Sequence, residues 1–303
     1  MKFLLVFVLV FFCKQLLSAE QKGRVVLITG ASRGIGLTAA EHLAKEGFRV
    51  YAGVRNLDTL VSKKNLHFEL LDVTDAVTIQ NIVQKIIRQE GSLDILINNA
   101  GYALGGPVEC LSMEEIKEQM DVNFFGVIRM CQTVLPQMRK QKKGQIINIS
   151  SEQSVYGLPY GSLYTASKAA LESLSEALSI EVLPWNIKVS IIEPGLLKTK
   201  FSIKMGTRSI EGTPYQKIVD IIQHSLYERN AHPELLTPSQ SPEEIALFLQ
   251  KVIEDPQPQL RYQTSKSAEE TVARCIKDMS GKEYLERMKL QVAQAYKQAW
   301  VSD

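Results

Sequence analysis

Short β-branched runs alternate with longer helical periods along most of this chain, and this alternation limits the possible folds more than any other feature. Six segments have the composition of strands: Val25–Thr29, Arg49–Val54, Leu66–Leu71, Leu93–Asn98, Gln145–Ser150 and Lys188–Glu193. Helical periods separate them, for example Gly36–Glu46 and Val77–Glu90. Because neighbouring parallel strands need long crossover connections, the alternation predicts a doubly wound, Rossmann-type α/β fold, with a parallel sheet and helices on both faces.

A single domain over residues 21–303 accounts for this pattern. Hydrophobic residues make up 45% of the 303 and charged residues 22%, which is the balance of a folded chain with one sizeable core. Residues 199–242 break the alternation and mix a helical stretch, Tyr215–Tyr227, with turn residues. Since ligands bind beyond the carboxyl ends of the strands in such folds, this region is predicted to be a substrate lid, with a surface elaboration as the alternative. A final helix is expected at about 280–300.

Residues 1–20 differ from the domain. Lys2 precedes the unbroken apolar run Phe3–Phe12, which is shorter than the roughly 20 residues of a membrane span and closer to the core of a signal peptide. Ala19 is a candidate for the last residue before a cleavage site. A retained segment would instead anchor the protein to a membrane, and a start-site artefact is the third interpretation.

Charge and cysteine usage exclude several classes of function. The net charge is +2, from 35 basic and 33 acidic residues mixed along the chain, so no basic patch indicates a nucleic-acid partner. The cysteines lie far apart, without a C-x-x-C pair, and the histidines are isolated: Cys13, Cys110, Cys131, Cys275, His42, His67, His224 and His232. The sequence therefore predicts neither a disulfide framework nor a metal site.

A glycine-rich turn directly follows the first strand and opens a helix. Its sequence is Thr29-Gly30-Ala31-Ser32-Arg33-Gly34-Ile35-Gly36. Glycine is needed where the chain turns tightly and where backbone approaches a pyrophosphate, which a helix N-terminus attracts. The G-x-x-x-G-x-G spacing alone is also compatible with a plain glycine turn, but the strand–turn–helix context favours a dinucleotide site. The candidate cofactor residues here are Gly30, Ser32, Arg33, Gly34, Ile35 and Gly36.

The ends of the next strands carry further cofactor candidates. An acidic residue at the end of the second strand would bind a ribose 2′-hydroxyl and repel a phosphate, but the segment there, Gly53-Val54-Arg55-Asn56, has no carboxylate. Arg55 and Arg33 can pair with a 2′-phosphate, which predicts NADP(H) in preference to NAD(H). The alternative is that both arginines are merely solvated. Asp72 ends the third strand near the expected adenine, and Asn99, in Asn98-Asn99-Ala100-Gly101, ends the fourth at the cofactor cleft.

The segment Tyr164-Thr165-Ala166-Ser167-Lys168 carries the expected chemistry. Residues four apart share one face of a helix, so a phenol and an ammonium lie side by side. A cation near Tyr164 is expected to lower the pKa of its phenol from about 10, so that it exchanges a proton with an alcohol or ketone. Tyr156 and Tyr160 have a tyrosine, not a lysine, four residues on. Ser151, thirteen residues before Tyr164, is placed to hold the substrate oxygen.

Together, these motifs resemble the short-chain dehydrogenase/reductase family. The matching signatures fall in family order over about residues 24–200: Thr29-Gly30-x-x-x-Gly34-x-Gly36, Asn98-Asn99-Ala100-Gly101, Asn123 within Asp121-Val122-Asn123, Ser151, Tyr164-x-x-x-Lys168, and Pro194-Gly195 with Thr199. The resemblance implies that Lys168 also holds the nicotinamide ribose and that Asn123 supports a water for proton relay. It further implies that Pro194, Gly195 and Thr199 flank the nicotinamide. A homodimer or homotetramer is expected.

A narrower resemblance points to the branch that contains 17β-hydroxysteroid and retinol dehydrogenases. It is carried by Val50-Tyr51-Ala52-Gly53-Val54-Arg55 and by Pro258-Gln259-Leu260-Arg261-Tyr262. The resemblance implies hydride transfer between NADP(H) and a bulky, apolar secondary alcohol or ketone of steroid or retinoid type. A nucleotide-sensing module without turnover is one alternative, although such proteins tend to lose the tyrosine or the lysine. A sugar-nucleotide epimerase or dehydratase is another, disfavoured by the glycine spacing and by the absence of a large C-terminal domain.

The need for a nicotinamide pool bears on the first residues of the chain. An enzyme exported beyond the cytoplasmic membrane of a bacterium would lack ready NADPH, and the cysteine pattern does not support an oxidising compartment. We therefore expect residues 2–19 to stay attached and to hold the domain at a membrane face with access to cofactor and to an apolar substrate. A cleaved signal peptide is the alternative.

Overall fold

Seven parallel strands form the central sheet of the computed structural model, which describes residues 23–58, 60–198, 203–206, 210, 212–221, 239–277, 286 and 290. The strand order is β3-β2-β1-β4-β6-β7-β9. The bounds are β1 (Val25–Thr29), β2 (Arg49–Val54), β3 (Leu66–Leu70), β4 (Ile95–Asn98), β6 (Gly144–Ile149), β7 (Ile187–Glu193) and β9 (Arg261–Gln263). Because the chain runs outward from β1 to β3 and then returns to β4, the order reverses between β1 and β4, where such folds bind ligands.

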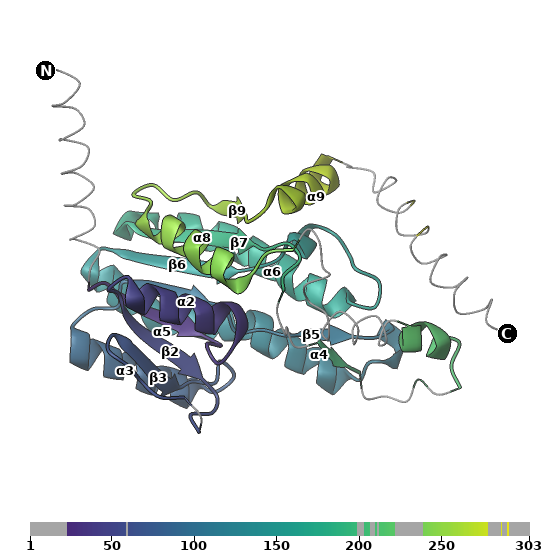
Figure 1. The fold of residues 1–303 in the computed structure, drawn as a ribbon, viewed down its shortest axis with the longest axis horizontal. Helices are drawn as coiled ribbons and strands as arrows, with labels where there is room; N and C mark the ends of the chain where they lie inside the picture. Colours follow the sequence, from purple (N-terminus) through teal and green to yellow (C-terminus); the bar gives the residue numbers. More distant parts are fainter. Residues whose placement is uncertain are drawn as a thin grey trace, which may run out of the picture.

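Helices cover both faces of the sheet (Figure 1). On one face, α2 (Gly34–Lys45) packs against α8 (Pro242–Glu254). The other face carries α3 (Ala76–Glu90), α5 (Gly126–Gln141) and α6 (Ser162–Glu181). Two further helices, α4 (Met113–Met120) and α9 (Lys266–Lys277), accompany the short turns η1 (Val108–Cys110), η2 (Asp121–Phe125), η3 (Glu152–Val155) and η4 (Leu183–Trp185). This arrangement confirms the predicted doubly wound α/β fold.

The central strands are buried on both sides, which explains their near-continuous apolar sequence. In β1, Val26 and Ile28 face the α2 and α8 layer. Their neighbours Val25 and Leu27 face the layer that contains α3, α5 and α6. All four side chains are fully buried. A strand with this environment cannot alternate apolar and polar residues, since neither of its faces meets water.

All six predicted strands are present, and their differences from the prediction have local causes. The fourth strand begins at Ile95 and not at Leu93, because the Leu93 amide donates to the side chain of Gln141 (3.0 Å) instead of entering the sheet. Helix α3 begins one residue earlier than predicted, at Ala76, where Asp75 caps it by accepting a hydrogen bond from the Val77 amide (2.8 Å). The seventh strand, β9, was not predicted.

A second, two-stranded sheet lies beyond the central one. Its strands, β5 (Ala103–Gly105) and β8 (Ile203–Met205), pair in parallel. This pairing joins part of the predicted lid to the segment that follows β4. Residues 216–221 of the predicted lid helix are helical, and the remainder of that helix lies outside the described residues.

Several predicted features lie wholly or mostly outside the described residues. They are the segment 1–20, Thr199, and the expected final helix at 280–300, apart from Glu286 and Leu290. Among the helices that the structure describes, none is both long enough and apolar enough to cross a membrane.

Candidate active site

A cavity of about 610 Å³ lies at the carboxyl ends of the parallel strands. It brings together two groups of residues that the sequence singled out. The cofactor group comprises Gly30, Ser32, Arg33, Gly34, Ile35, Arg55, Asp72 and Asn99. The chemical group comprises Ser151, Tyr164, Lys168, Pro194 and Gly195. Of the other predicted site residues, Gly36 and Asn123 lie behind the cavity wall and Thr199 lies outside the described residues.

The glycine turn fits a pyrophosphate. Gly30 and Gly34 have φ angles of 67° and 56°, a region that favours glycine. A Cβ at Gly30 would lie 2.7 Å from the Ala100 backbone, whereas one at Gly34 would meet nothing within 4 Å. Open space therefore faces the start of α2, where the N-cap Arg33 makes no side-chain capping bond. A helix N-terminus with uncapped amides attracts an anion.

Gly36 and Asn99 shape this turn from behind. A Cβ at Gly36 would approach both the Asn99 amide nitrogen and the Gly30 carbonyl oxygen to 2.5 Å, so only glycine lets the helix pack so closely. Asn99 Nδ2 donates to the carbonyl oxygens of Thr29 and Gly30, each at 3.0 Å. Asn99 thus fixes the turn to the end of β4, in addition to lining the cavity. Gly36 acts through packing and does not line the cavity.

Charged residues mark the far end of the cofactor group. Arg33 and Arg55 are exposed, and neither forms an ion pair within the described part of the chain. Asp72 accepts hydrogen bonds from the amide (2.9 Å) and hydroxyl (2.7 Å) of Thr74, which orient its carboxylate at the end of β3. The nearest acid after β2, Asp58, bonds with Asn56 and does not line the cavity. This end of the cavity therefore suits an anionic group.

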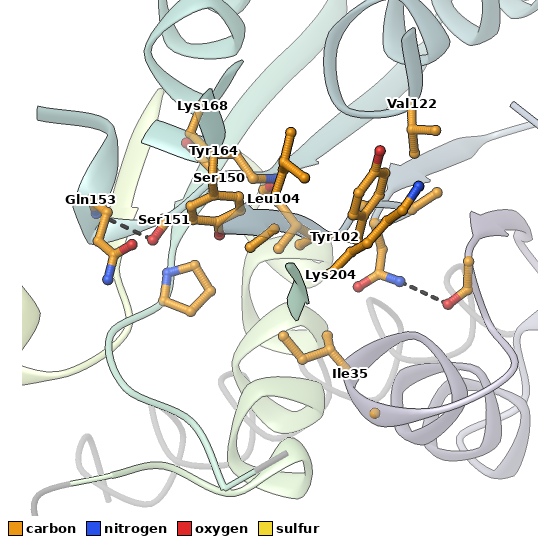
Figure 2. A pocket seen from close by; sticks show the side chains of 18 of the residues that line it. Ile35, Tyr102, Leu104, Val122, Ser150, Ser151, Gln153, Tyr164, Lys168 and Lys204 are labelled. Carbon is orange, nitrogen blue, oxygen red and sulfur yellow. Dashed lines mark hydrogen bonds between the residues drawn. The ribbon is translucent and has the colours of Figure 1, made fainter. Parts of the chain in front are cut away.

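The chemical group is held by η3 and α6. Ser151 directly precedes η3, and its hydroxyl forms a hydrogen bond with the Tyr164 phenol. The Ser151 oxygen also accepts from the Gln153 amide at 3.2 Å. Lys168 lies one helical turn beyond Tyr164, with Nζ 5.8 Å from the centre of the phenol ring. Figure 2 shows Ser151, Tyr164 and Lys168 together on one wall of the cavity.

The structure differs from the expectation that Lys168 lowers the pKa of Tyr164. Burial raises the pKa of the Tyr164 phenol to about 12, the hydrogen bond with Ser151 lowers it, and the charge of Glu152 raises it. The Lys168 ammonium lies 5.8 Å from the centre of the phenol ring and donates to the Ile149 carbonyl oxygen (2.7 Å). Burial lowers the pKa of Lys168 itself to about 8, while Glu172 raises it. The hydrogen bond from Ser151 therefore favours the phenolate, but burial outweighs it in this state.

Asn123 lies in the π-helical turn η2 and is buried. Its amide nitrogen donates to the Tyr102 carbonyl (2.9 Å) and to the Ser167 hydroxyl (3.1 Å) of α6. A Cβ at Gly101 would lie 3.2 Å from Asn123 Oδ1 and 3.8 Å from Lys168 Nζ, so both side chains face Gly101. Such π-turns occur often at functional sites, and this one ties Asn123 to the helix of Tyr164.

Other residues around the chemical group were not predicted. Figure 2 shows Tyr102, Leu104, Val122 and Lys204 around the same cavity. Lys204 reaches it through β8, where its ammonium pairs with Glu118 of α4 (2.7 Å). No sequence signal joins segments a hundred residues apart through strands of three residues. Glu152, by contrast, adjoins Ser151 and could have been found from that adjacency.

Comparisons with known sequences agree with this geometry. A sequence model of the family described as short chain dehydrogenase matches residues 24–209. A 3-ketodihydrosphingosine reductase of Bacteroides thetaiotaomicron is 43% identical over 62% of this chain and 70% of its own length. Human 17-beta-hydroxysteroid dehydrogenase type 1 is 33% identical over 88% of this chain and 85% of its own length. Bovine retinol dehydrogenase 8 is 33% identical over 86% of this chain and 88% of its own length.

Solved structures show the same fold. A short-chain dehydrogenase from Streptomyces avermitilis superimposes with a TM-score of 0.72 at 29% identity, over 93% of this chain and all of its own. An alcohol dehydrogenase from the archaeon Thermococcus sibiricus, complexed with 5-hydroxy-NADP, gives 0.63 at 26% identity, over 80% and 96% of the two chains. The protein is therefore an oxidoreductase of the short-chain dehydrogenase/reductase family, in the branch of the 17β-hydroxysteroid and retinol dehydrogenases.

Proposed function

We propose that the protein transfers a hydride between NADP(H) and a bulky, apolar secondary alcohol or ketone of steroid or retinoid type. One observation carries this proposal: the hydrogen-bonded pair of Ser151 and Tyr164 lies in one cavity with the glycine turn and the two exposed arginines. A proton-exchanging group and a dinucleotide cradle are then open to the same space.

The preference for NADP(H) rests on charge. Arg33 and Arg55 can bind a 2′-phosphate with charge-assisted hydrogen bonds, and no carboxylate lines the cavity at the end of β2. The amides at the start of α2 would hold the pyrophosphate, Lys168 the nicotinamide ribose, and Pro194 and Gly195 would flank the ring. When bound, the cofactor supplies or accepts the hydride. The Thermococcus neighbour, complexed with 5-hydroxy-NADP, supports this choice.

The protein's own residues bind the substrate and move a proton. The Ser151 hydroxyl donates to the substrate oxygen and keeps it beside the Tyr164 phenol. In the reductive direction the phenol gives its proton to that oxygen, and in the oxidative direction the phenolate takes one from the alcohol. Asn123 holds η2 against α6 through Ser167, which keeps the helix of Tyr164 and Lys168 in place.

An apolar substrate fits the remaining wall of the cavity. That wall is lined by Leu104, Val122, Leu158, Leu196, Leu197 and Met205. Binding pockets for bulky apolar ligands have this composition, with a few polar groups that fix orientation. Relatives whose names refer to a 17-beta-hydroxysteroid, to retinol and to 3-ketodihydrosphingosine support a bulky, mainly apolar substrate.

A substrate panel tests this function. NADPH oxidation, followed by absorbance, should be fast with some members of a panel of steroids, retinoids and long aliphatic ketones, and slow with small polar ketones and quinones. Folded protein that binds NADPH but reduces no member of the panel, and oxidises none of the matching alcohols with NADP⁺, would contradict the proposal.

A further inference from the structure

Glu152 places a carboxylate at the chemical end of the cavity. It follows Ser151 directly, begins η3 and is half-buried in the cavity wall. Its amide donates to the Pro194 carbonyl oxygen (3.0 Å), and a Cβ at Gly195 would lie 3.2 Å from its Oε2 atom. The backbone and side chain of Glu152 are therefore both held between the Ser151 turn and the Pro194-Gly195 segment.

This carboxylate has no partner in the part of the chain that the structure describes, where it accepts no hydrogen bond and forms no ion pair. The other acids of the cavity are satisfied: Glu118 pairs with Lys204 at 2.7 Å, and Asp72 accepts from Thr74. The buried ammonium of Lys168 donates to the Ile149 carbonyl and forms no ion pair with Glu152 in the described part of the chain. A half-buried carboxylate without a donor is costly, and a cationic ligand would offset that cost.

The charge of Glu152 also acts on the reacting group. Burial raises the pKa of Glu152. Its charge is one of the influences that raise the pKa of Tyr164. The carboxylate is therefore within electrostatic reach of the phenol. A cation bound to Glu152, the residue that follows Ser151, would cancel this unfavourable effect on the phenolate.

We propose that Glu152 binds an ammonium group carried by the substrate close to its reacting carbon. This assignment rests on the proposed function and adds to it that, among bulky and mainly apolar ketones and alcohols, the site favours those that carry an ammonium group. The ammonium contacts Glu152, the oxygen contacts Ser151 and Tyr164, and the apolar remainder packs on Leu104 and Leu158. A neutral ketone of the same shape would leave Glu152 buried without a donor, so the site discriminates against it.

Two matched ketones test this proposal. One is a long-chain 2-amino ketone, assayed below the pKa of its amine, and the other carries a methyl group in place of the ammonium. With NADPH, the enzyme should favour the amino ketone in kcat/KM. Glu152→Gln should lower kcat/KM for the amino ketone about 10- to 100-fold, as expected for loss of a hydrogen bond between charged groups. For the neutral ketone, kcat/KM of Glu152→Gln should stay unchanged or rise.

The matched control is Glu118→Gln, which removes a cavity carboxylate that already has a cationic partner and should leave the ratio between the two ketones unchanged. A parent enzyme that favours the neutral ketone would overturn the proposal, as would equal losses for both ketones in Glu152→Gln.

A binding measurement separates this proposal from the proposed function. Calorimetric titration of the 2-amino alcohol into NADP⁺-loaded protein should give weaker binding for Glu152→Gln than for the parent. If neither ketone is reduced, the proposed function fails, and the titration still decides whether Glu152 holds an ammonium. Equal affinities of the parent and Glu152→Gln for the 2-amino alcohol would refute the proposal that Glu152 binds an ammonium group.

Discussion

At the scale of single residues, the site depends on where each polar hydrogen is directed. The Lys168 ammonium donates a hydrogen bond to the Ile149 carbonyl oxygen (2.7 Å), whereas the Ser151 hydroxyl bonds to the Tyr164 phenol. The sequence correctly placed Lys168 on the same helix face as Tyr164. Its effect on the phenol, however, depends on where its ammonium group points, and residue spacing does not specify this. Proximity on a helix is predictable from sequence, and hydrogen-bond partners across the site are not.

Tyr164→Phe tests the proton-exchanging role directly. The variant keeps the ring and loses only the hydroxyl that bonds to Ser151. We expect turnover to fall by at least the roughly 10²- to 10⁴-fold that general acid–base catalysis supplies, with NADPH affinity unchanged. Steady-state assays and a fluorescence titration of NADPH measure the two effects. Tyr160→Phe, which removes another cavity phenol, should do far less; near-normal activity of Tyr164→Phe would contradict the mechanism.

Arg55→Asp tests the cofactor preference. The parent should favour NADPH over NADH in kcat/KM, because Arg55 and Arg33 line the cavity and no acid does so at the end of β2. The substitution replaces an attraction for a 2′-phosphate with a repulsion, so the NADPH/NADH ratio should fall by about 10- to 100-fold or reverse. Lys45→Asp, on the same helix as the glycine turn but outside the cavity lining, is the charge control. An unmodified enzyme that prefers NADH would exclude this interpretation.

At the scale of elements, the sequence predicts what is periodic and misses what is short. The six long strands were found because five have runs of buried apolar residues and β3 alternates buried Leu66 and Phe68 with polar residues. Strands β5, β8 and β9 have only three residues each, so none shows an alternation that could identify it. Their positions follow from tertiary contacts, and they carry Lys204 to the cavity and Arg261 to the sheet edge. The cofactor half of the site was therefore more predictable than the substrate half.

Arg261 of strand β9 contacts two buried acids of the neighbouring elements. Arg261 contacts Glu172 (3.0 Å) and Glu176 (2.6 Å) of α6 and Glu193 (3.3 Å) of β7. Glu193 is fully buried, and burial raises its pKa; a hydrogen bond from Gln263 lowers it, and the neighbouring Glu172 carboxyl raises it. Glu172 and Glu193 thus form a neighbouring pair of buried acids that both contact the Arg261 guanidinium. This pair ties the helix of Tyr164 and Lys168 to the strand that leads into Pro194 and Gly195.

The raised pKa of Glu193 predicts how stability depends on pH. In the folded state Glu193 holds a proton that the unfolded chain releases above about pH 4.3, so its contribution favours folding below that pH and declines as the pH rises toward the folded value. Glu193→Gln is neutral throughout. The difference in Tm, variant minus parent, should therefore increase between about pH 4.5 and 8 in thermal melts.

The control for this series is Glu176→Gln, which removes the half-exposed partner of Arg261. Its ion pair matters only where the carboxylate is charged, so its Tm difference should not increase with pH. A flat or falling difference for Glu193→Gln would show that burial does not raise the pKa of Glu193.

At the scale of the whole molecule, the two ends of the parallel strands have different surroundings. The cavity lies at their carboxyl ends, whereas Gly23 precedes β1 at the amino end, where its amide bonds to the Gly47 carbonyl (2.9 Å). The fold predicted from strand and helix alternation fixes this polarity, because all strands of the central sheet are parallel. Gly23 thus lies at the amino ends of the strands, on the side of the sheet opposite to the cavity. A homodimer or homotetramer remains a prediction at this scale.

This polarity bears on the compartment of the enzyme. We propose that residues 2–19 stay attached and hold the domain at a membrane face with access to NADP(H). An attachment near the amino ends of the strands would leave the cavity at their carboxyl ends open to the cofactor and to an apolar substrate from the bilayer. Deletion of residues 2–19 should therefore release the protein from the membrane fraction without lowering kcat/KM for a water-soluble ketone. Cell fractionation, with mass spectrometry of the mature N-terminus, measures the outcome. Recovery of soluble protein that begins at Glu20 would instead identify the segment as a cleaved signal peptide.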